Sequence, residues 1–188
     1  VEPGSIQKMA SNLPSSAREK YYNAQLLYPD GQTHEVKYRF RGRSIYHWNP
    51  KKPSLRIKTS RKNPFEQLRH FNLINPEDRA MISNFYGEYL ADKMGVLTHN
   101  TKFVELFINQ KYVGVYHFTT NDDEEMLRAN DRVPGPIYVG DDLADRWELD
   151  QFKTKGDLKA HKNLLPLKIL LDAIYAESSI NQIDGLWN

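Results

Sequence analysis

The sequence predicts an α+β fold in which an antiparallel sheet is joined by one main helix. Alternating apolar and polar residues run through 33–41 and 55–59, the period of two that a half-buried strand requires. A capped segment with an apolar face over 76–94 predicts the helix, and a second pair of strands follows it. Because strands and helices come in separate runs and not in βαβ alternation, the class is α+β.

A hairpin opens the sheet. A strand is expected from Tyr21 to Tyr28, and its return from Thr33 to Arg41. The four residues between them are Pro-Asp-Gly-Gln, in which proline presets φ and glycine accepts a positive φ. The remaining expected strands are Leu55 to Thr59, Phe71 to Ile74, Phe103 to Ile108, Tyr112 to Phe118 and Ile137 to Val139.

The main helix has clear end signals. It is preceded by Asn75-Pro76-Glu77-Asp78, where asparagine can cap free N–H groups and two acids suit the positive end of the helix dipole. Gly95 marks its end. An apolar face is expected from Met81, Ile82, Phe85, Tyr89 and Leu90. Shorter helices are expected at 124–130 and 164–175, and residues 1–19 form an irregular lead-in or a short helix near 15–20.

Composition sets limits on the class of protein. The chain has 188 residues, a net charge of +2 and 39% hydrophobic residues, which suits an ordinary packed core and excludes a disordered or collagen-like chain. It has no cysteine, so disulfide scaffolds, Cys-based zinc sites and thiol catalysis are excluded. No apolar run is long enough to cross a membrane.

The small net charge hides a polarised distribution. Residues 36–65 contain ten Lys and Arg and no acid, whereas residues 121–150 contain ten acids and three Arg. The two blocks could be solvated faces that attract each other, or the basic block could bind phosphate. Aromatic residues within the basic block suggest nucleic-acid binding as a further hypothesis. Against it, the sequence pI is only about 8.6 and no known nucleic-acid-binding module is present.

Familiar catalytic signatures are missing, and one basic hairpin remains. The chain has no GxxxxGK[ST] or GxGxxG phosphate loop, no HExxH and no GxSxG. Its six histidines show no metal-ligand spacing. The hairpin ends in Arg41-Gly42-Arg43-Ser44, and Lys51-Lys52 then lead into the next strand. Glycine allows a backbone to approach an anion and lysine neutralises phosphate oxygens, an arrangement that protein kinases place over ATP.

These residues resemble the CotH kinase family, the spore coat protein H-like atypical protein kinases. The resemblance rests on four motifs in order over roughly residues 36–130. They are Phe40-Arg41-Gly42-Arg43-Ser44, Lys51-Lys52-Pro53-Ser54-Leu55-Arg56-Ile57, the helix start at Asn75 leading to Asn84 and Gly95, and the hairpin Phe103 to Asn109 with Gly114-Val115-Tyr116. The chain departs from the family pattern at Ser83, Gln110 and Thr120.

The resemblance implies an atypical kinase fold that holds ATP and Mg²⁺ between a small sheet lobe and a helical lobe. It implies that Lys52 is a strand lysine that contacts nucleotide phosphates, that Arg41 and Arg43 touch phosphate, and that Glu88 on the helix pairs with the lysine. The implied substrate is a Ser-rich protein. The family's catalytic and metal-binding carboxylates are expected farther downstream, so no catalytic residue and no metal ligand is assigned in this chain.

The expected organisation follows from the same resemblance. It comprises a lead-in at 1–19, a kinase-like N-lobe at 20–130, and a linker with the start of a helical C-lobe at 131–188, in a chain that looks truncated. The leading hypothesis is transfer of the ATP γ-phosphoryl group to Ser or Thr, with this piece inactive alone. The alternative is a non-catalytic interaction module of a coat or cell-surface assembly that docks an acidic partner, and a third hypothesis is a binder of anionic polysaccharide. The resemblance suggests a spore coat, a cell surface or secretion, although no signal peptide is visible.

Overall fold

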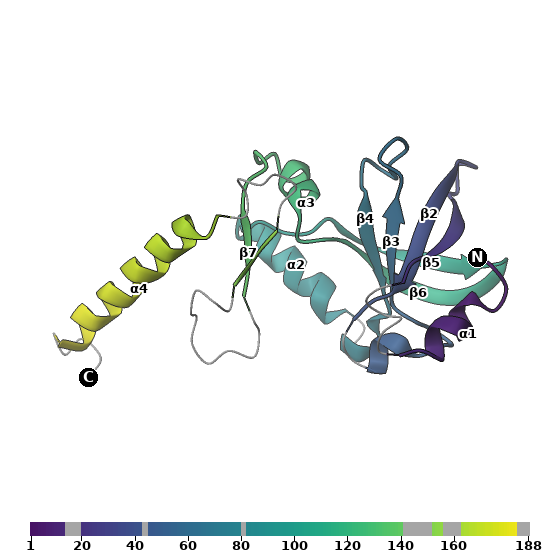
Figure 1. The fold of residues 1–188 in the computed structure, drawn as a ribbon, viewed down its shortest axis with the longest axis horizontal. Helices are drawn as coiled ribbons and strands as arrows, with labels where there is room; N and C mark the ends of the chain where they lie inside the picture. Colours follow the sequence, from purple (N-terminus) through teal and green to yellow (C-terminus); the bar gives the residue numbers. More distant parts are fainter. Residues whose placement is uncertain (14–19, 43–44, 80–81, 141–151, 156–162, 184–188) are drawn as a thin grey trace. The chain divides into compact units, whose positions relative to one another are not determined.

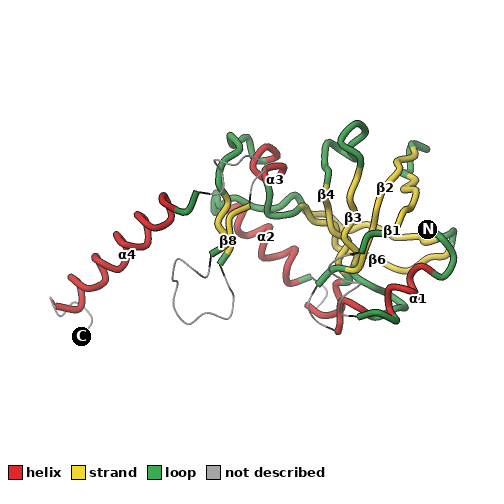
Figure 2. Tube along the Cα trace, in the orientation of Figure 1, coloured by secondary structure: helices red, strands yellow, loops and turns green. Residues whose placement is uncertain are grey.

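The computed structural model describes residues 1–13, 20–42, 45–79, 82–140, 152–155 and 163–183. The chain divides into two compact units, one over Val1–Asn121 and the other over Asp122–Asn188. The first unit contains the large sheet, and the second contains two helices and a two-stranded sheet (Figures 1 and 2).

The first unit is built on a six-stranded antiparallel sheet with strand order β1-β2-β3-β4-β6-β5. Its strands are β1 (Tyr22–Leu27), β2 (Thr33–Phe40), β3 (Leu55–Thr59), β4 (His70–Ile74), β5 (Thr101–Ile108) and β6 (Lys111–Thr120). Its helical segments are α1 (Ser5–Ala10), the 3₁₀ turns η2 (Ile45–Trp48) and η3 (Pro76–Arg79), and α2 (Ser83–Lys93). The predicted α+β class and antiparallel sheet are confirmed.

The sheet has a core face and an outer face. On β2 every second residue is buried, and the intervening residues point to the other side, as strand geometry requires. The core face carries the buried aromatic and aliphatic cluster of the unit. Its members include Val36, Tyr38, Phe40, Leu55, Ile57, Phe71, Leu73, Tyr116 and Phe118. The face that carries the intervening residues is called the outer face here.

Helix α1 packs on the core face, and the sequence did not predict it. Met9 is fully buried in the core cluster, with Ile6 and Ala10 packed beside it. The Ser5 hydroxyl lies 2.6 Å from the buried Tyr38 hydroxyl. A helix of six residues is too short to be stable alone, so burial of Met9 explains why it forms. The short helix expected near 15–20 falls mostly outside the described residues.

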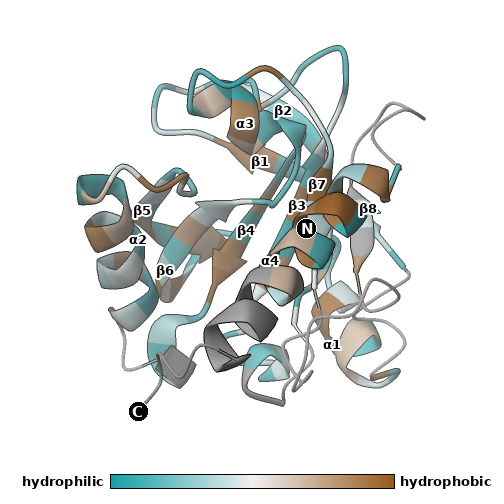
Figure 3. Ribbon diagram, turned by 90° about the vertical axis from the view of Figure 1, so that its left-hand side faces the viewer, coloured by the Kyte–Doolittle hydropathy of each residue, from teal (hydrophilic) through white to brown (hydrophobic). Residues whose placement is uncertain are grey.

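Helix α2 packs on the outer face over the β5–β6 hairpin. The Phe85 ring lies 4.9 Å from the Phe103 ring and 6.2 Å from the His117 ring. Hydrophobic and hydrophilic residues both occur along α2 (Figure 3). The predicted apolar face is only partly used, because Phe85 is half-buried whereas Ile82, Tyr89 and Leu90 are exposed.

The helix expected over 76–94 is not continuous, which corrects the sequence prediction. The asparagine signal is real but caps a 3₁₀ turn, because the Asn75 Oδ1 accepts the Glu77 N–H at 3.3 Å. Helix α2 begins only at Ser83, after Ile82, and has no side-chain cap. The predicted stop at Gly95 agrees with a helix that ends at Lys93.

The second unit contains α3 (Glu124–Ala129), the sheet formed by β7 (Ile137–Val139) and β8 (Lys153–Lys155), and α4 (Leu165–Ile183). The Asp123 carboxylate caps α3 by accepting the Glu125 N–H at 3.0 Å. Strand β8 was not predicted, and α4 extends well beyond the expected end at 175. None of the described helices is long and apolar enough to span a membrane.

Candidate functional site

The turn after β2 is fixed by packing. Gly42 has a φ of +97°, a conformation that glycine adopts readily and other residues avoid. A Cβ at this position would overlap the His47 ring, so the space that glycine leaves is filled by η2. The Trp48 indole N–H also donates to the Gly42 carbonyl at 3.2 Å. The glycine of the Arg-Gly motif is therefore required by the way η2 folds back.

Ser54 joins three segments at the start of β3. It is fully buried. Its N–H donates to the His47 carbonyl at 2.8 Å, and its hydroxyl lies 3.0 Å from His47 Nδ1. The same hydroxyl accepts the Asn75 N–H at 2.9 Å, which leaves its own proton for the histidine ring. Ser54 therefore connects η2, β3 and the end of β4.

Lys52 forms an ion pair with Glu77. Its Nζ lies 2.9 Å from Glu77 Oε1, and the lysine side chain is 16% exposed against 54% for the glutamate. Asn75 holds the two together, because its Nδ2 donates to the Lys52 carbonyl at 3.1 Å while its Oδ1 accepts the Glu77 N–H. Lys52 lies in the turn before β3, which corrects the expectation that it is on the strand.

Strand β6 forms the wall beside the lysine. The Lys52 Nζ lies 5.9 Å from the centre of the Tyr116 ring, within reach of a cation–π contact. Gly114 has a φ of +135°, and a Cβ there would approach Lys52 Cε to 3.1 Å. Tyr116 is fully buried, and its hydroxyl has no hydrogen-bond partner among the described residues. The lysine stem therefore lies in a slot that a glycine keeps open.

The charges in this cluster shift its acid–base properties. The hydrogen bond from Lys52 lowers the pKa of Glu77, a smaller effect of partial burial opposes it, and the Asn75 hydrogen bond adds to the lowering. Burial, with a further contribution from the Glu77 charge, raises the pKa of the Tyr116 phenol well above its ordinary value. At neutral pH the cluster contains an ionised glutamate and a neutral tyrosine beside the ammonium.

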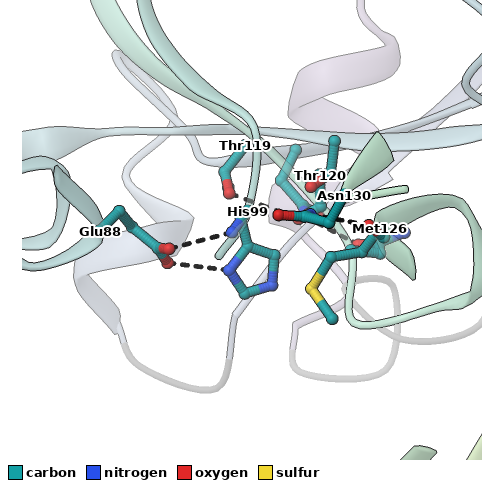
Figure 4. A network of polar contacts seen from close by, with 8 residues as sticks. Glu88, His99, Thr119, Thr120, Met126 and Asn130 are labelled. Carbon is teal, nitrogen blue, oxygen red and sulfur yellow. Dashed lines mark hydrogen bonds and ion pairs between the residues drawn. The ribbon is translucent and has the colours of Figure 1, made fainter. Parts of the chain in front are cut away.

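Glu88 pairs with His99 and not with Lys52. One carboxylate oxygen lies 2.8 Å from His99 Nδ1, and the other accepts the His99 N–H at 3.0 Å (Figure 4). This pair ties α2 to the segment that leads into β5. The expected pairing of Glu88 with Lys52 is not formed, because Lys52 pairs with Glu77 and Glu88 pairs with His99.

The two pairs lie on opposite faces of the sheet. Lys52 contacts Gly114 and Tyr116, which point to the core side of β6, whereas α2 packs on His117 of the outer face. Burial lowers the pKa of His117. The Glu88 charge acts to raise this pKa, and the Arg41 charge lowers it further. The charges of Arg41 and Glu88 therefore act on His117 at the outer face, whereas Lys52 lies on the core side.

The two predicted arginines have different outcomes. Arg41 follows β2, is half-buried, and donates its backbone N–H to the Ser54 carbonyl at 2.8 Å. Arg43 lies outside the described residues. Of the four predicted cofactor-binding residues, the structure therefore describes Lys52, Arg41 and Glu88 and does not bring them to one point.

The family model of CotH kinase protein matches residues 38–166, which is more than half of the chain. The chain belongs to the CotH kinase family. No curated protein matches the chain. The matched region includes Lys52, Glu77 and the whole of β3 to β6. Membership supports a kinase-type function and the use of ATP and a divalent metal.

The Lys52 cluster of this CotH family member offers a cation and not a set of free oxygen ligands. The ammonium is held in a fixed position, and a buried ring and an unpartnered phenol line its surroundings. The Glu77 carboxylate already forms an ion pair with this ammonium. A Mg²⁺ ion requires several free oxygen ligands, which the described residues of the cluster do not provide.

Glu77, Asn75 and Tyr116 are the contributors that sequence reasoning missed. Glu77 and Asn75 were interpreted as a helix start, and Tyr116 only as part of a hairpin motif. Asn75-Pro76-Glu77 and the Lys51-Lys52 motif both belong to the ordered motifs that resemble the family, and this shared membership is the signal that could have linked them. Local sequence preferences predict a helix cap for Asn75 and Glu77, and they contain no information about an ion pair with a residue distant in sequence.

Proposed function

We propose that this chain is part of a CotH-type protein kinase that transfers the γ-phosphoryl group of ATP to Ser or Thr of a protein. The observation that carries the proposal is the Lys52–Glu77 ion pair within the region that matches the family. In protein kinases a lysine near the third strand is held by a glutamate so that it meets nucleotide phosphates. Here Glu77 supplies the carboxylate that the sequence interpretation sought in Glu88.

The cluster performs positioning and charge neutralisation in this proposal. Glu77 orients the Lys52 ammonium, and Asn75 fixes the backbone of both residues. Gly114 leaves room for the lysine stem, and the buried Tyr116 ring lies beside the ammonium. A preorganised cation stabilises charge that develops on a transferred phosphoryl group more effectively than a mobile surface lysine does.

The finer assignments belong to the same proposal. ATP with Mg²⁺ is the proposed cofactor, and a Ser-rich protein of a spore coat or cell surface is the proposed substrate. Arg43 is proposed to add positive charge beside the phosphates, whereas Arg41 acts on the outer face and is not part of this proposal. The proposed lobes are the sheet region at 20–130 and the following helical region at 131–188.

Calorimetric titration of the chain with ATP and Mg²⁺ tests the nucleotide site. We expect the wild-type chain to bind, Lys52→Ala to weaken binding roughly tenfold, and Glu77→Gln to weaken it less. Lys62→Ala is the matched control, because Lys62 is exposed in the connection after β3. The control removes the same charge away from the cluster and is expected to bind ATP like the wild type.

Two results would count against the nucleotide site. Equal binding by the wild type and Lys52→Ala would show that the phosphates do not meet this lysine. Loss of binding in Lys62→Ala as large as in Lys52→Ala would show that only net charge matters. Incorporation of labelled γ-phosphate into a Ser-rich protein, by a chain extended through the helical lobe, tests the transfer reaction itself.

A non-catalytic interaction module is the second candidate function. It is favoured by paired basic side chains on the outer face of β2 and β3, which would attract an acidic partner. Failure of the extended chain to bind ATP, together with retained binding of an anionic protein, would favour this candidate over the kinase.

A further inference from the structure

Strand β5 forms one edge of the six-stranded sheet. Among the described strands only β6 pairs with it, so the backbone N–H and C=O groups along its other side have no strand partner within the described residues. The strand runs over Thr101–Ile108 and contains no proline, which would interrupt pairing. A long edge of this kind is a template that an extended segment of another chain can continue as an added strand.

Aromatic side chains cover the outer face along this edge. Phe103, Glu105 and Phe107 occupy alternate positions of β5 and therefore share this face. Phe107 is 56% exposed and Tyr112 on β6 is 50% exposed, and the centres of their rings are 5.2 Å apart. Helix α2 contacts the Phe103 end through Phe85, yet Phe103 is still 39% exposed. Exposed rings gathered in this way indicate a contact surface, and we call Phe103, Glu105, Phe107 and Tyr112 the edge patch.

Glu105 is the charged member of the edge patch. It lies between the two phenylalanines on β5 and faces Val115 on β6, which is also exposed. Glu105 is exposed and forms no ion pair within the part of the chain that the structure describes. A carboxylate on an edge strand disfavours pairing with an acidic segment and favours a cation. The rings beside it can also hold a cation through cation–π contacts.

The pattern that complements the edge patch follows from strand geometry. Directly opposed residues of neighbouring strands have Cβ atoms about 4.5–5.5 Å apart, so a Lys or Arg opposite Glu105 forms a cross-strand pair of opposite charges. Residues two positions away on either side lie roughly 6.8 Å along the strand, opposite Phe103 and Phe107. Apolar side chains suit both positions. The complementary segment is therefore extended and reads apolar-x-Lys/Arg-x-apolar.

We propose that β5 and the edge patch bind an extended segment of a partner protein with this pattern, which adds to the sheet as a further strand. The proposal does not rest on the kinase function, because neither Lys52 nor a nucleotide contributes to this edge. It also differs from the docking of an acidic partner on β2 and β3. Those strands lie toward the opposite edge of the sheet and carry the opposite charge.

Fluorescence anisotropy with labelled, end-capped peptides tests the edge patch in the absence of nucleotide. The probes contain Ile-Thr-Lys-Thr-Ile, Ile-Thr-Glu-Thr-Ile or Ile-Lys-Thr-Thr-Ile, each flanked by serines. Glu105→Gln removes the carboxylate, and its matched control is Glu35→Gln at an exposed position of β2. Phe107→Thr removes one ring, and its matched control is Leu27→Thr on the opposite edge strand, where Leu27 is 69% exposed. Circular dichroism verifies that all five chains are folded.

We expect the wild type to bind Ile-Thr-Lys-Thr-Ile best. Glu105→Gln should weaken this binding roughly threefold to fivefold, as an exposed ion pair would, and Phe107→Thr about fivefold. Both control variants should bind like the wild type. The glutamate peptide should bind more weakly, and so should Ile-Lys-Thr-Thr-Ile, whose lysine projects to the other face of an added strand. Binding should also weaken as salt is raised, because exposed charges are screened.

Backbone N-methylation of the lysine peptide tests pairing with the free edge of β5. One version is methylated at the isoleucines and the lysine, and the other at the threonines. The N–H groups of alternate residues in a strand point to opposite sides, so only one of the two sets faces β5. We expect one version to lose binding and the other to keep it.

Five outcomes would overturn the proposal. They are no binding to the wild type, equal affinity for the glutamate peptide, an equal loss in a control variant and its test variant, equal binding by the two methylated peptides, and a dimer of the wild-type chain that Phe107→Thr dissociates. The last, measured by light scattering, would assign the edge to a second copy of this chain. Failure of the kinase proposal is seen separately, because unchanged ATP binding in Lys52→Ala leaves the peptide measurements as they are.

Discussion

Lys52 and Glu77 are 25 residues apart in sequence, yet their side chains meet at 2.9 Å. Glu77 lies in the 3₁₀ turn η3, whereas Glu88 lies on the helix α2. The two acids therefore face different sides of the sheet. Glu77 serves the lysine, and Glu88 anchors α2 to His99.

The pH dependence of stability should reveal the Lys52–Glu77 pair. Because the pKa of Glu77 is lowered in the folded chain, its contribution is fully present above the ordinary glutamate pKa of about 4.3 and is lost as pH falls through the lower folded value. Urea denaturation of the wild type and Glu77→Gln should differ at pH 6–7, and the difference should shrink below about pH 4.

Glu105→Gln on the exposed side of β5 is the control for this titration. This substitution also removes one carboxylate charge, but at a position that does not contact Lys52 in the described structure. A wild-type advantage over Glu77→Gln that stays constant down to pH 3 would contradict the assigned ion pair.

Ser54→Ala should destabilise the first unit by about 1–3 kcal/mol, because the buried Asn75 N–H would lose its acceptor. Urea denaturation measures the change. Ser60→Ala is the matched control, since its hydroxyl accepts the Lys62 N–H at an exposed position and should cost little. Equal costs for the two serines would show that the Ser54 connection contributes nothing specific.

The sheet was largely predictable because its strands follow local rules. The alternation Val36, Tyr38, Phe40 and the apolar positions of β3 reflect a single buried face, and β3 has the predicted bounds. The turn residues Pro29 to Gln32 also act locally. Such signals are contained within a few residues, so the sequence alone specifies them.

Features that depend on distant contacts could not be predicted in the same way. Helix α1 forms because Met9 is buried against strands that come later in the chain. Asn75 caps a turn in either helix type, so its signal does not distinguish a 3₁₀ turn from an α-helix. Lys52 pairs with Glu77 and not with Glu88 because of how the chain folds, and no local sequence pattern distinguishes the two acids.

Gly114→Ala should destabilise the chain more than Gly31→Ala does. Both glycines have positive φ, at +135° and +85°, so each substitution introduces backbone strain. Only at Gly114 would the new Cβ also press on Lys52 Cε, at 3.1 Å. We expect the difference in the free energy of unfolding to be about 1 kcal/mol or more. Equal effects would show that the lysine stem moves aside without cost.

Gln110→Gly should stabilise the β5–β6 hairpin. Asn109 and Gln110 have φ values of +50° and +67°, so both central residues of the turn adopt the left-handed conformation. Asparagine tolerates it, whereas glutamine is strained there, and glycine is the preferred second residue of such a turn. We expect the free energy of unfolding to rise by about 0.5–1 kcal/mol, measured by urea denaturation.

Gln32→Gly provides the matched comparison for this last substitution. Gln32 ends the β1–β2 turn and is not among the residues with positive φ, so glycine there only adds freedom to the unfolded chain. The two substitutions should therefore change stability in opposite directions. If both destabilise the chain, the strain assigned to Gln110 does not limit the stability of the hairpin.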